Sequence, residues 1–366
     1  MNTQPTKKHR IFEDVCEMEW KNWRWQIANS IHDIKGLENL LDLSPEELAG
    51  IEKAGRAFRW AITPYYASLM SAEDPNCPVR LQAIPDVREL DDEDGLLDPL
   101  QEENHSPVRD MIHLYPNRVA LCVSDLCMSY CRHCFRKRRT LRSYDKNDFA
   151  PALEYIRAHE EINDVLVTGG DPLMMDDDSL CEKLAALRQI KHVKLLRIGT
   201  RAPVTLPYRI TPQLAKRLAE FHPLYINTQF NHPKEITPES ARAVDLLLKA
   251  GIPVGNQSVL LKGINDERDT LKSLLEKLLE IRVRPYYIFH PHRQSGTRHF
   301  RLSVDRGMEI MSSLRGYTSG MAIPTYALDT PHGKVPLCDN RIIKNDEKGT
   351  LVRTFDGTEW FELKEE

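Results

Sequence analysis

The chain has 366 residues, 41% of them hydrophobic, which is enough to bury the core of one large domain and an appended region. Its 50 basic and 54 acidic residues leave a formal net charge of −4, so no global positive field points to nucleic acid or an anionic membrane. The first residues are polar, and no apolar run approaches the roughly 18 residues that span a bilayer. We therefore expect a cytoplasmic protein with neither a membrane nor a nucleic-acid partner.

Residues 1–110 are expected to form an N-terminal helical and wrapping region. Ser44, Pro45 and Glu47 have the arrangement of a capping box with proline at the first helical position, which predicts a helix start. Residues 72–108 are rich in proline and acidic side chains and have few periodic apolar positions. That composition predicts a long ordered loop or wrapping segment.

Residues 111–320 alternate short apolar segments with helical patterns, which is typical of a parallel sheet covered by helices. Six strand–helix alternations are fewer than the eight of a closed barrel, so the pattern predicts an α/β fold with an open or partial (β/α)6 barrel. The predicted strands cover residues 118–123, 164–170, 193–200, 224–230, 253–261 and 284–289.

The helices between these strands have clear signals. Thr211 and Thr237 each precede a proline and predict helix starts, and a leucine-rich face over residues 268–281 suits a helix that covers a sheet. In the last region, residues 321–366, apolar positions alternate around Asp356 and Gly357, which predicts a C-terminal β-hairpin.

Three cysteines, Cys127, Cys131 and Cys134, follow the first strand in a C-x3-C-x2-C array. They would lie at the carboxyl end of the sheet, where α/β barrels hold their active sites. Three thiolates suit zinc or an iron–sulfur centre, but a structural zinc site needs four ligands and a 4Fe–4S cluster normally takes four cysteines. A cluster held by three would leave one iron open to a substrate or cofactor.

The array resembles the signature of the radical S-adenosylmethionine (SAM) superfamily, with His133 as the aromatic ring before the last cysteine. The resemblance implies a 4Fe–4S cluster on the three cysteines, bound SAM, and a reductant such as a flavodoxin or ferredoxin. The turn "VTGGDPL" looks like the superfamily's GGE-type turn, whose glycines let the backbone approach SAM closely. The residues that it assigns to SAM are Thr168, Gly169, Gly170 and Asp171.

From about residue 20 to residue 360 the chain resembles the lysine 2,3-aminomutase family, on stretches such as "CRHCFRKRR", "NTQFNHPKEIT", "GNQSVLLKGIND" and "YTSGMAIPTYALDTPHGK". The resemblance implies a homo-oligomer that uses pyridoxal phosphate (PLP) and moves the α-amino group of a free amino acid to its β carbon. The first choice of reaction is L-lysine to β-lysine. Open alternatives are glutamate or another polar amino acid, a lysine on a translation factor, or a non-catalytic iron–sulfur redox or sensor protein.

Residue roles are carried over by the same resemblance. Lys334 is the counterpart of the lysine that forms the PLP aldimine, and Arg118 of an arginine that binds the PLP phosphate. A second basic residue of the phosphate site is replaced by Leu114. Arg136 corresponds to the residue that binds the substrate α-carboxylate, while Lys137 to Arg139 are expected to be solvated; Gln257 corresponds to a position near SAM.

The substrate end departs from the pattern. Lysine-specific members hold the substrate ε-ammonium between two aspartates, of which one matches Asp329 and the other is His292 here, followed by Arg293. Glutamate-specific members place a basic residue at that position. Either His292 faces the substrate or it points away in a repacked loop.

Two further departures concern other ligands. A histidine of the family is replaced by Gln229, and Glu267 stands where larger relatives have a zinc-binding cysteine, so the resemblance predicts no structural zinc. The remaining cysteines, among them Cys16 and Cys338, are expected to pack in the interior. Trp20 fits either a subunit interface or a core.

Overall fold

The computed structural model describes residues 5–141, 148–338 and 341–364. Its centre is a nine-stranded sheet in the order β1 to β9, in which β2 to β8 run parallel while β1 and β9 pair antiparallel with their neighbours. The strands are β1 Met111–Tyr115, β2 Arg118–Cys122, β3 Asp164–Thr168, β4 Leu195–Gly199, β5 Leu224–Thr228, β6 Val254–Val259, β7 Arg284–Phe289, β8 Thr325–Thr330 and β9 Gly333–Pro336.

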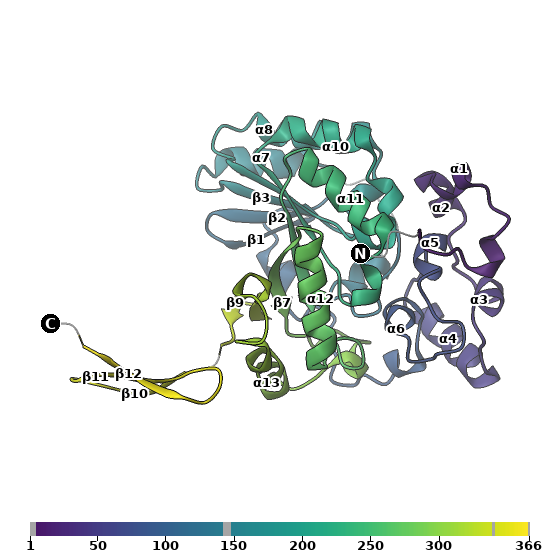
Figure 1. Cartoon of the computed structure of the whole chain (residues 1–366). Helices are drawn as coiled ribbons and strands as arrows, with labels where there is room; N and C mark the ends of the chain where they lie inside the picture. Colours follow the sequence, from purple (N-terminus) through teal and green to yellow (C-terminus); the bar gives the residue numbers. More distant parts are fainter. Residues whose placement is uncertain (1–4, 142–147, 339–340, 365–366) are drawn as a thin grey trace.

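A helix follows each of the strands β2 to β7, so the predicted partial barrel of six strand–helix units is confirmed (Figure 1). The two sheet edges approach each other, because the backbone N–H of Lys334 on β9 donates to the Tyr115 hydroxyl on β1 at 2.8 Å. The helices are α1 Glu17–Trp20, α2 Trp23–Ala28, α3 Ile34–Leu40, α4 Pro45–Ala57, α5 Pro64–Ala67, α6 Pro78–Ala83, α7 Ala150–Ala158, α8 Asp177–Arg188, α9 Ala202–Thr205, α10 Pro212–Leu218, α11 Pro238–Lys249, α12 Arg268–Glu280 and α13 Val304–Leu314.

The helix signals in the sequence are confirmed. Ser44 and Glu47 form the capping box of α4, and the side chains of Thr211 and Thr237 cap α10 and α11. The leucine face of α12 is buried against the sheet. Its members are Leu271, Leu274, Leu275 and Leu278.

The N-terminal helices α1 to α6 share one hydrophobic cluster with the barrel. Trp20 is 2% exposed and packs on the rings of Phe12 and Trp25, so it is a core residue of the chain. The proline- and acid-rich stretch is more regular than expected, since it contains α6 and the short 3-10 helices Val87–Glu89 and Glu102–His105.

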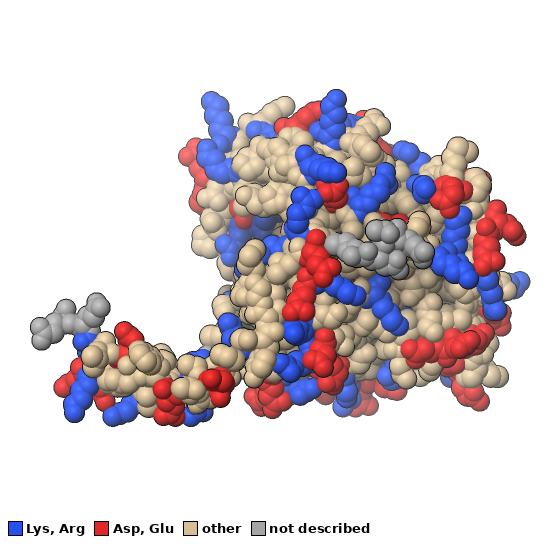
Figure 2. All heavy atoms as spheres, in the orientation of Figure 1, with Lys and Arg blue, Asp and Glu red and all other residues tan. Residues whose placement is uncertain are grey.

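A three-stranded sheet, β10 Ile342–Asp346, β11 Gly349–Arg353 and β12 Glu359–Leu363, extends away from the body as an arm (Figure 1). The predicted hairpin is its β11–β12 pair, with Val352 opposite Trp360. Figure 2 shows acidic and basic side chains interspersed with other surface along the arm. Its exposed apolar side chains include Trp360 at 61% and Leu363 at 73%.

Two cysteines outside the C-x3-C-x2-C array lie at the surface. Cys16 and Cys338 are exposed, so the prediction that they pack in the interior is wrong; both lie outside the hydrophobic core of the barrel. None of the helices in the described ranges is long and apolar enough to cross a membrane.

Replacing Leu274 by alanine should lower the free energy of unfolding by about 2–5 kcal/mol, because a fully buried leucine on α12 leaves a cavity against the sheet. Lys272→Ala, on the more exposed side of the same helix, is the matched control and should change it by less than about 0.5 kcal/mol. Urea denaturation followed by circular dichroism measures both. Equal losses would contradict the assignment of the buried face.

Candidate active site

One cavity of about 530 Å³ runs through the barrel, from the cysteine loop after β2 down to Arg118 at the start of that strand. Every site residue predicted from the sequence lines it, although these residues come from distant parts of the chain. They are Arg118, Cys127, Cys131, Cys134, Arg136, Thr168, Gly169, Gly170, Asp171, Gln257, His292, Asp329 and Lys334.

The three cysteines of the loop are free thiols that face this cavity. Burial, and next the neighbouring Cys134 thiol, raise the pKa of Cys127. Burial, and next the neighbouring Cys131 thiol, raise the pKa of Cys134 to about 11. Metal binding must therefore displace thiol protons. Among the described residues, no group of three His, Cys, Asp or Glu side chains is arranged to hold a single metal ion. Three cysteine thiolates are the ligand type that iron–sulfur clusters take.

Acidic residues of the wrapping segment fix the cysteine loop in place. Arg132, between the second and third cysteines, donates to both oxygens of Glu89 at 2.8 and 2.5 Å, and Lys137 Nζ lies 2.8 Å from the same carboxylate. All three side chains are almost completely buried. This pairing is a long-range contact between two charged segments.

The prediction that Lys137 to Arg139 are solvated is therefore wrong. Arg139 binds Asp110 and Asp125, and Arg138 binds Asp98 and Glu102. Each cation has a carboxylate partner, mostly from the acid-rich stretch before β1. The signal in the sequence was charge complementarity between the basic run after Cys134 and the acid-rich segment at residues 72–108.

The glycine turn after β3 packs directly on the cysteine loop. A Cβ on Gly169, whose φ is +135°, would lie 2.3 Å from the carbonyl oxygen of Ser124, and one on Gly170 would lie 2.4 Å from that of Leu126. The backbone N–H groups of Gly170 and Asp171 donate to these same carbonyls at 2.5 and 2.7 Å. The glycines are required by this contact between two loops, whatever they also do for a ligand.

The Asp171 carboxylate joins the turn to the loop after β4. It accepts hydrogen bonds from the backbone N–H of Leu173, the Thr200 hydroxyl and the backbone N–H of Arg201, at 2.7 to 2.9 Å. Burial raises its pKa. These bonds reach both carboxylate oxygens and fix the orientation of the side chain.

Arg136 is held in a fixed orientation at the cavity wall. Its Nε and Nη2 donate to one oxygen of Glu102 at 2.9 and 2.7 Å, while Nη1 lies 3.4 Å from the Thr168 hydroxyl. Burial opposes the charge of Arg136, but Glu102 outweighs it and raises the pKa. Glu102 was not identified from the sequence, and it orients the guanidinium fork at the proposed carboxylate site.

At the other end of the cavity, Asp329 lies opposite Lys334 in the β8–β9 ladder. Lys334 Nζ is 3.2 Å from one carboxylate oxygen and His292 Nε2 is 3.7 Å from the other. Burial would raise the pKa of Asp329, yet His292 and Lys334 together lower it. His292 thus faces the cavity, whereas the exposed Arg293 turns away and donates to the backbone carbonyl of Asp94.

Tyr115 connects the two residues predicted to bind PLP. The Arg118 guanidinium stacks 3.7 Å from the centroid of the Tyr115 ring. The Tyr115 hydroxyl accepts a hydrogen bond from the backbone N–H of Lys334. Lys334 Nζ also lies 5.5 Å from the Phe289 ring centroid. An amine, a guanidinium and aromatic faces on one wall fit a flat aromatic cofactor that carries a phosphate.

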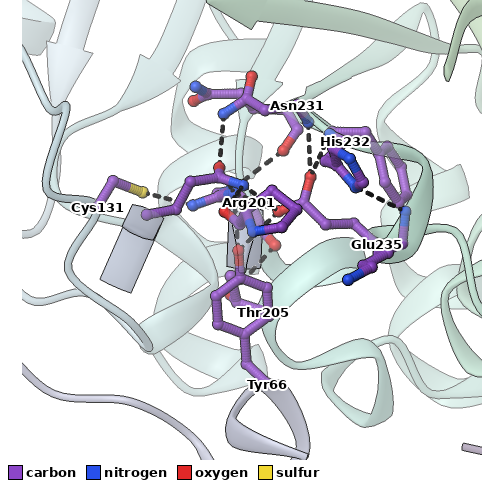
Figure 3. Close-up of polar contacts among 12 residues, drawn as sticks. Tyr66, Cys131, Arg201, Thr205, Asn231, His232 and Glu235 are labelled. Atoms are coloured by element: carbon purple, nitrogen blue, oxygen red, sulfur yellow. Dashed lines mark hydrogen bonds and ion pairs between the residues drawn. The ribbon is translucent and has the colours of Figure 1, made fainter. Parts of the chain in front are cut away.

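A buried polar network behind the cysteines was not predicted (Figure 3). Arg201, after β4, donates to Cys131 Sγ and pairs with the buried Glu235. Gln229, which replaces the family's histidine, lies 3.0 Å from His133 Nε2 through its side-chain nitrogen. Burial, with Arg201 and Lys137 nearby, lowers the pKa of His133 well below its ordinary value, so that ring is neutral.

The cavity, its three free thiols and the barrel around them define a radical SAM enzyme, and comparisons with known proteins agree. The radical SAM superfamily profile matches residues 121–275 and the lysine-2,3-aminomutase profile matches residues 311–361. Relatives at least 41% identical also match 93% or more of this chain, so the chain belongs to the lysine 2,3-aminomutase family of radical SAM enzymes.

Individual relatives are similar over nearly the whole chain. The L-lysine 2,3-aminomutase of Clostridium subterminale is 45% identical over 357 residues, which cover 96% of this chain and 86% of that protein. The glutamate 2,3-aminomutase of Clostridioides difficile strain 630 is 46% identical over 347 residues, covering 93% and 82%. The L-lysine 2,3-aminomutase of Bacillus subtilis strain 168 is 41% identical, covering 96% and 76%.

Replacing Gly170 by alanine should lower the iron content of the reconstituted protein, since the added methyl would push the turn off the cysteine loop at a cost of about 1–3 kcal/mol. Gly320→Ala is the matched control, because a Cβ there meets nothing within 4 Å. Iron and sulfide assays after anaerobic reconstitution measure the difference. Full iron content in Gly170→Ala would contradict the role given to this contact.

Proposed function

We propose that the chain is a PLP-dependent 2,3-aminomutase that converts free L-lysine to β-lysine. The observation that carries the choice of lysine is the charge at the substrate end of the cavity. Asp329 places a carboxylate there, beside His292 and Lys334. Arg293, which could have reversed the charge, lies outside the cavity lining and contacts Asp94.

Residues that line the cavity would hold the cluster, SAM and PLP. Cys127, Cys131 and Cys134 would bind the cluster, and Lys334 would attach PLP covalently with Arg118 at its phosphate. SAM would bind near the turn at residues 168–171 and Gln257. When bound, these groups supply the radical chemistry that moves an amino group between adjacent carbons.

Arg136 and Asp329 would position the substrate between them. Arg136, oriented by Glu102, would bind the α-carboxylate through the guanidinium N–H groups that face the cavity. Asp329 would accept hydrogen bonds from the side-chain ammonium, with the His292 ring beside it. The buried walls would exclude water from the reacting carbons and hold them in register.

Glutamate is the second candidate, favoured by the relative from Clostridioides difficile that bears that name. Asp329 argues against glutamate, because its carboxylate would repel the side-chain carboxylate of that substrate. A lysine carried by a translation factor is a further alternative, but the buried setting of Arg136 and Glu102 favours a free α-carboxylate. The paired Lys334 and Asp329 argue against a purely redox protein.

We also propose a cytoplasmic homo-oligomer, because a reducing compartment protects the thiols and the arm exposes apolar side chains such as Trp360. Removal of residues 341–366 should lower the number of subunits per particle, obtained from the molar mass measured by light scattering after gel filtration. An unchanged number of subunits would contradict a role of the arm in assembly.

The test of the reaction is an anaerobic assay of protein reconstituted with iron, sulfide, PLP, SAM and a reductant. L-Lysine, L-glutamate and L-arginine are supplied separately, and the β-amino acid is measured by mass spectrometry after derivatisation. We expect β-lysine as the main product. β-Glutamate as the main product, or cleavage of SAM with no isomerised amino acid, would contradict the proposal.

Two variants test the substrate end. Asp329→Asn should raise KM for lysine by roughly 10- to 100-fold, because the ammonium loses a charged hydrogen bond of about 1.5–3 kcal/mol. His292→Asp supplies a second carboxylate beside Asp329 and should lower KM for lysine. No change in either variant would place the substrate ammonium elsewhere.

Lys334→Ala should remove the visible absorbance band of lysine-bound PLP from the purified protein. Lys344→Ala, on the exposed arm, is the matched control and should retain the band. Retention of the band in Lys334→Ala would show that another amine holds the cofactor.

A further inference from the structure

Arg201 places a fixed positive charge on one of the three cysteines. It follows β4, is 8% exposed and lines the cavity. Its Nη1 lies 2.9 Å from Cys131 Sγ (Figure 3). Cys134 Sγ accepts a longer hydrogen bond, of 3.4 Å, from the uncharged backbone N–H of Arg136. A hydrogen bond from a cation is about twice as strong as one between neutral groups, so the thiols are electrostatically unequal.

The rest of the Arg201 head group is held from several elements. Nη2 lies 2.6 Å from both Glu235 Oε1 and Gln82 Oε1 and 3.1 Å from the Tyr66 hydroxyl, while Nε donates to the backbone carbonyl of Gln229 at 3.1 Å. Gln82 and Tyr66 come from the N-terminal helices α6 and α5. With those N–H groups occupied, Nη1 stays directed at the sulfur.

The Glu235 carboxylate is itself fully satisfied. The Tyr66 hydroxyl donates to Oε1 at 2.6 Å, and the backbone N–H groups of Asn231 and His232 donate to Oε2 at 2.6 and 2.9 Å (Figure 3). The side chain has no exposed surface. Arg201 cannot turn away from Cys131 without leaving a buried carboxylate unpaired, which is strongly unfavourable.

We propose that Arg201 is a positioning residue that raises the reduction potential of the cluster through its charged hydrogen bond to Cys131. This inference rests on the cluster assigned to the cysteines in the proposed function. One-electron reduction adds negative charge to the cluster and its thiolates, so a fixed cation and N–H donor at one sulfur stabilise the reduced form more than the oxidised form.

The test is a redox titration of the anaerobically reconstituted full chain without SAM, with the reduced cluster measured by electron paramagnetic resonance. Arg201→Gln should shift the midpoint potential to a more negative value, and Arg201→Lys, which keeps the charge, should shift it less. Arg209→Gln is the matched control, because Arg209 is also buried but pairs with Asp177 and the Leu173 carbonyl and, within the described residues, donates to no cysteine sulfur. Its potential should equal that of the unmodified chain.

Iron content separates the possible failures. An unmodified chain that takes up no cluster would refute the proposed function and this inference with it. Arg201→Gln with full iron content and an unchanged potential would overturn the inference alone, as would an equal shift in Arg209→Gln. If the potential is unchanged and only SAM binding weakens, Arg201 serves SAM and not the cluster. Arg201→Lys decides the matter if Arg201→Gln does not fold.

Discussion

The buried charge triad of Glu89, Arg132 and Lys137 is the constraint on which the site depends. The loop from β2 to residue 136 has no regular secondary structure of its own, yet it must present three thiols to one cavity. Glu89 holds Arg132, which lies between two of those cysteines, and Lys137 just after them. Removing one partner of a buried ion pair typically costs about 3–5 kcal/mol, so this anchor is strong.

The N-terminal region is therefore part of the active site. Its carboxylates and amides reach the barrel at two points, Glu89 and Glu102 at the cysteine loop and Gln82 at the network behind it. The same segment orients Arg136, the proposed carboxylate ligand, through Glu102. A chain reduced to the strands and helices of the barrel would keep the thiols but lose the groups that fix their positions.

Local signals were readable from the sequence, and long-range pairings were not. The caps at Ser44 and Thr237, the buried face of α12 and the hairpin around Gly357 depend on residues close in the chain. The strands β1 and β9, at the two edges of the sheet, and β8 beside β9 were not predicted, because the pairing of a strand depends on its partners and not only on its own pattern. The basic residues after Cys134 looked like a solvated run because their acidic partners lie between 14 and 48 residues earlier.

The candidate site shows the same division. Its cysteines, Lys334 and Asp329 were found through short motifs and resemblance, and the structure brings them to one cavity. Glu102, Glu235 and Arg201 act through contacts across 34 to 70 residues of sequence, so no motif could reveal them. The glycines after β3 were singled out as SAM-binding residues, which stays a prediction, while the contact that requires them in the structure is with the cysteine loop.

We propose that one cavity holds the cluster, SAM, PLP and the amino acid, with the substrate between Arg136 and Asp329. An anaerobic crystal structure of the reconstituted chain with SAM, PLP and L-lysine would test this arrangement. We expect iron on the three cysteines, PLP attached at Lys334 with its phosphate at Arg118, and the lysine carboxylate at Arg136. PLP or lysine bound outside this cavity, or a lysine ammonium away from Asp329, would contradict it.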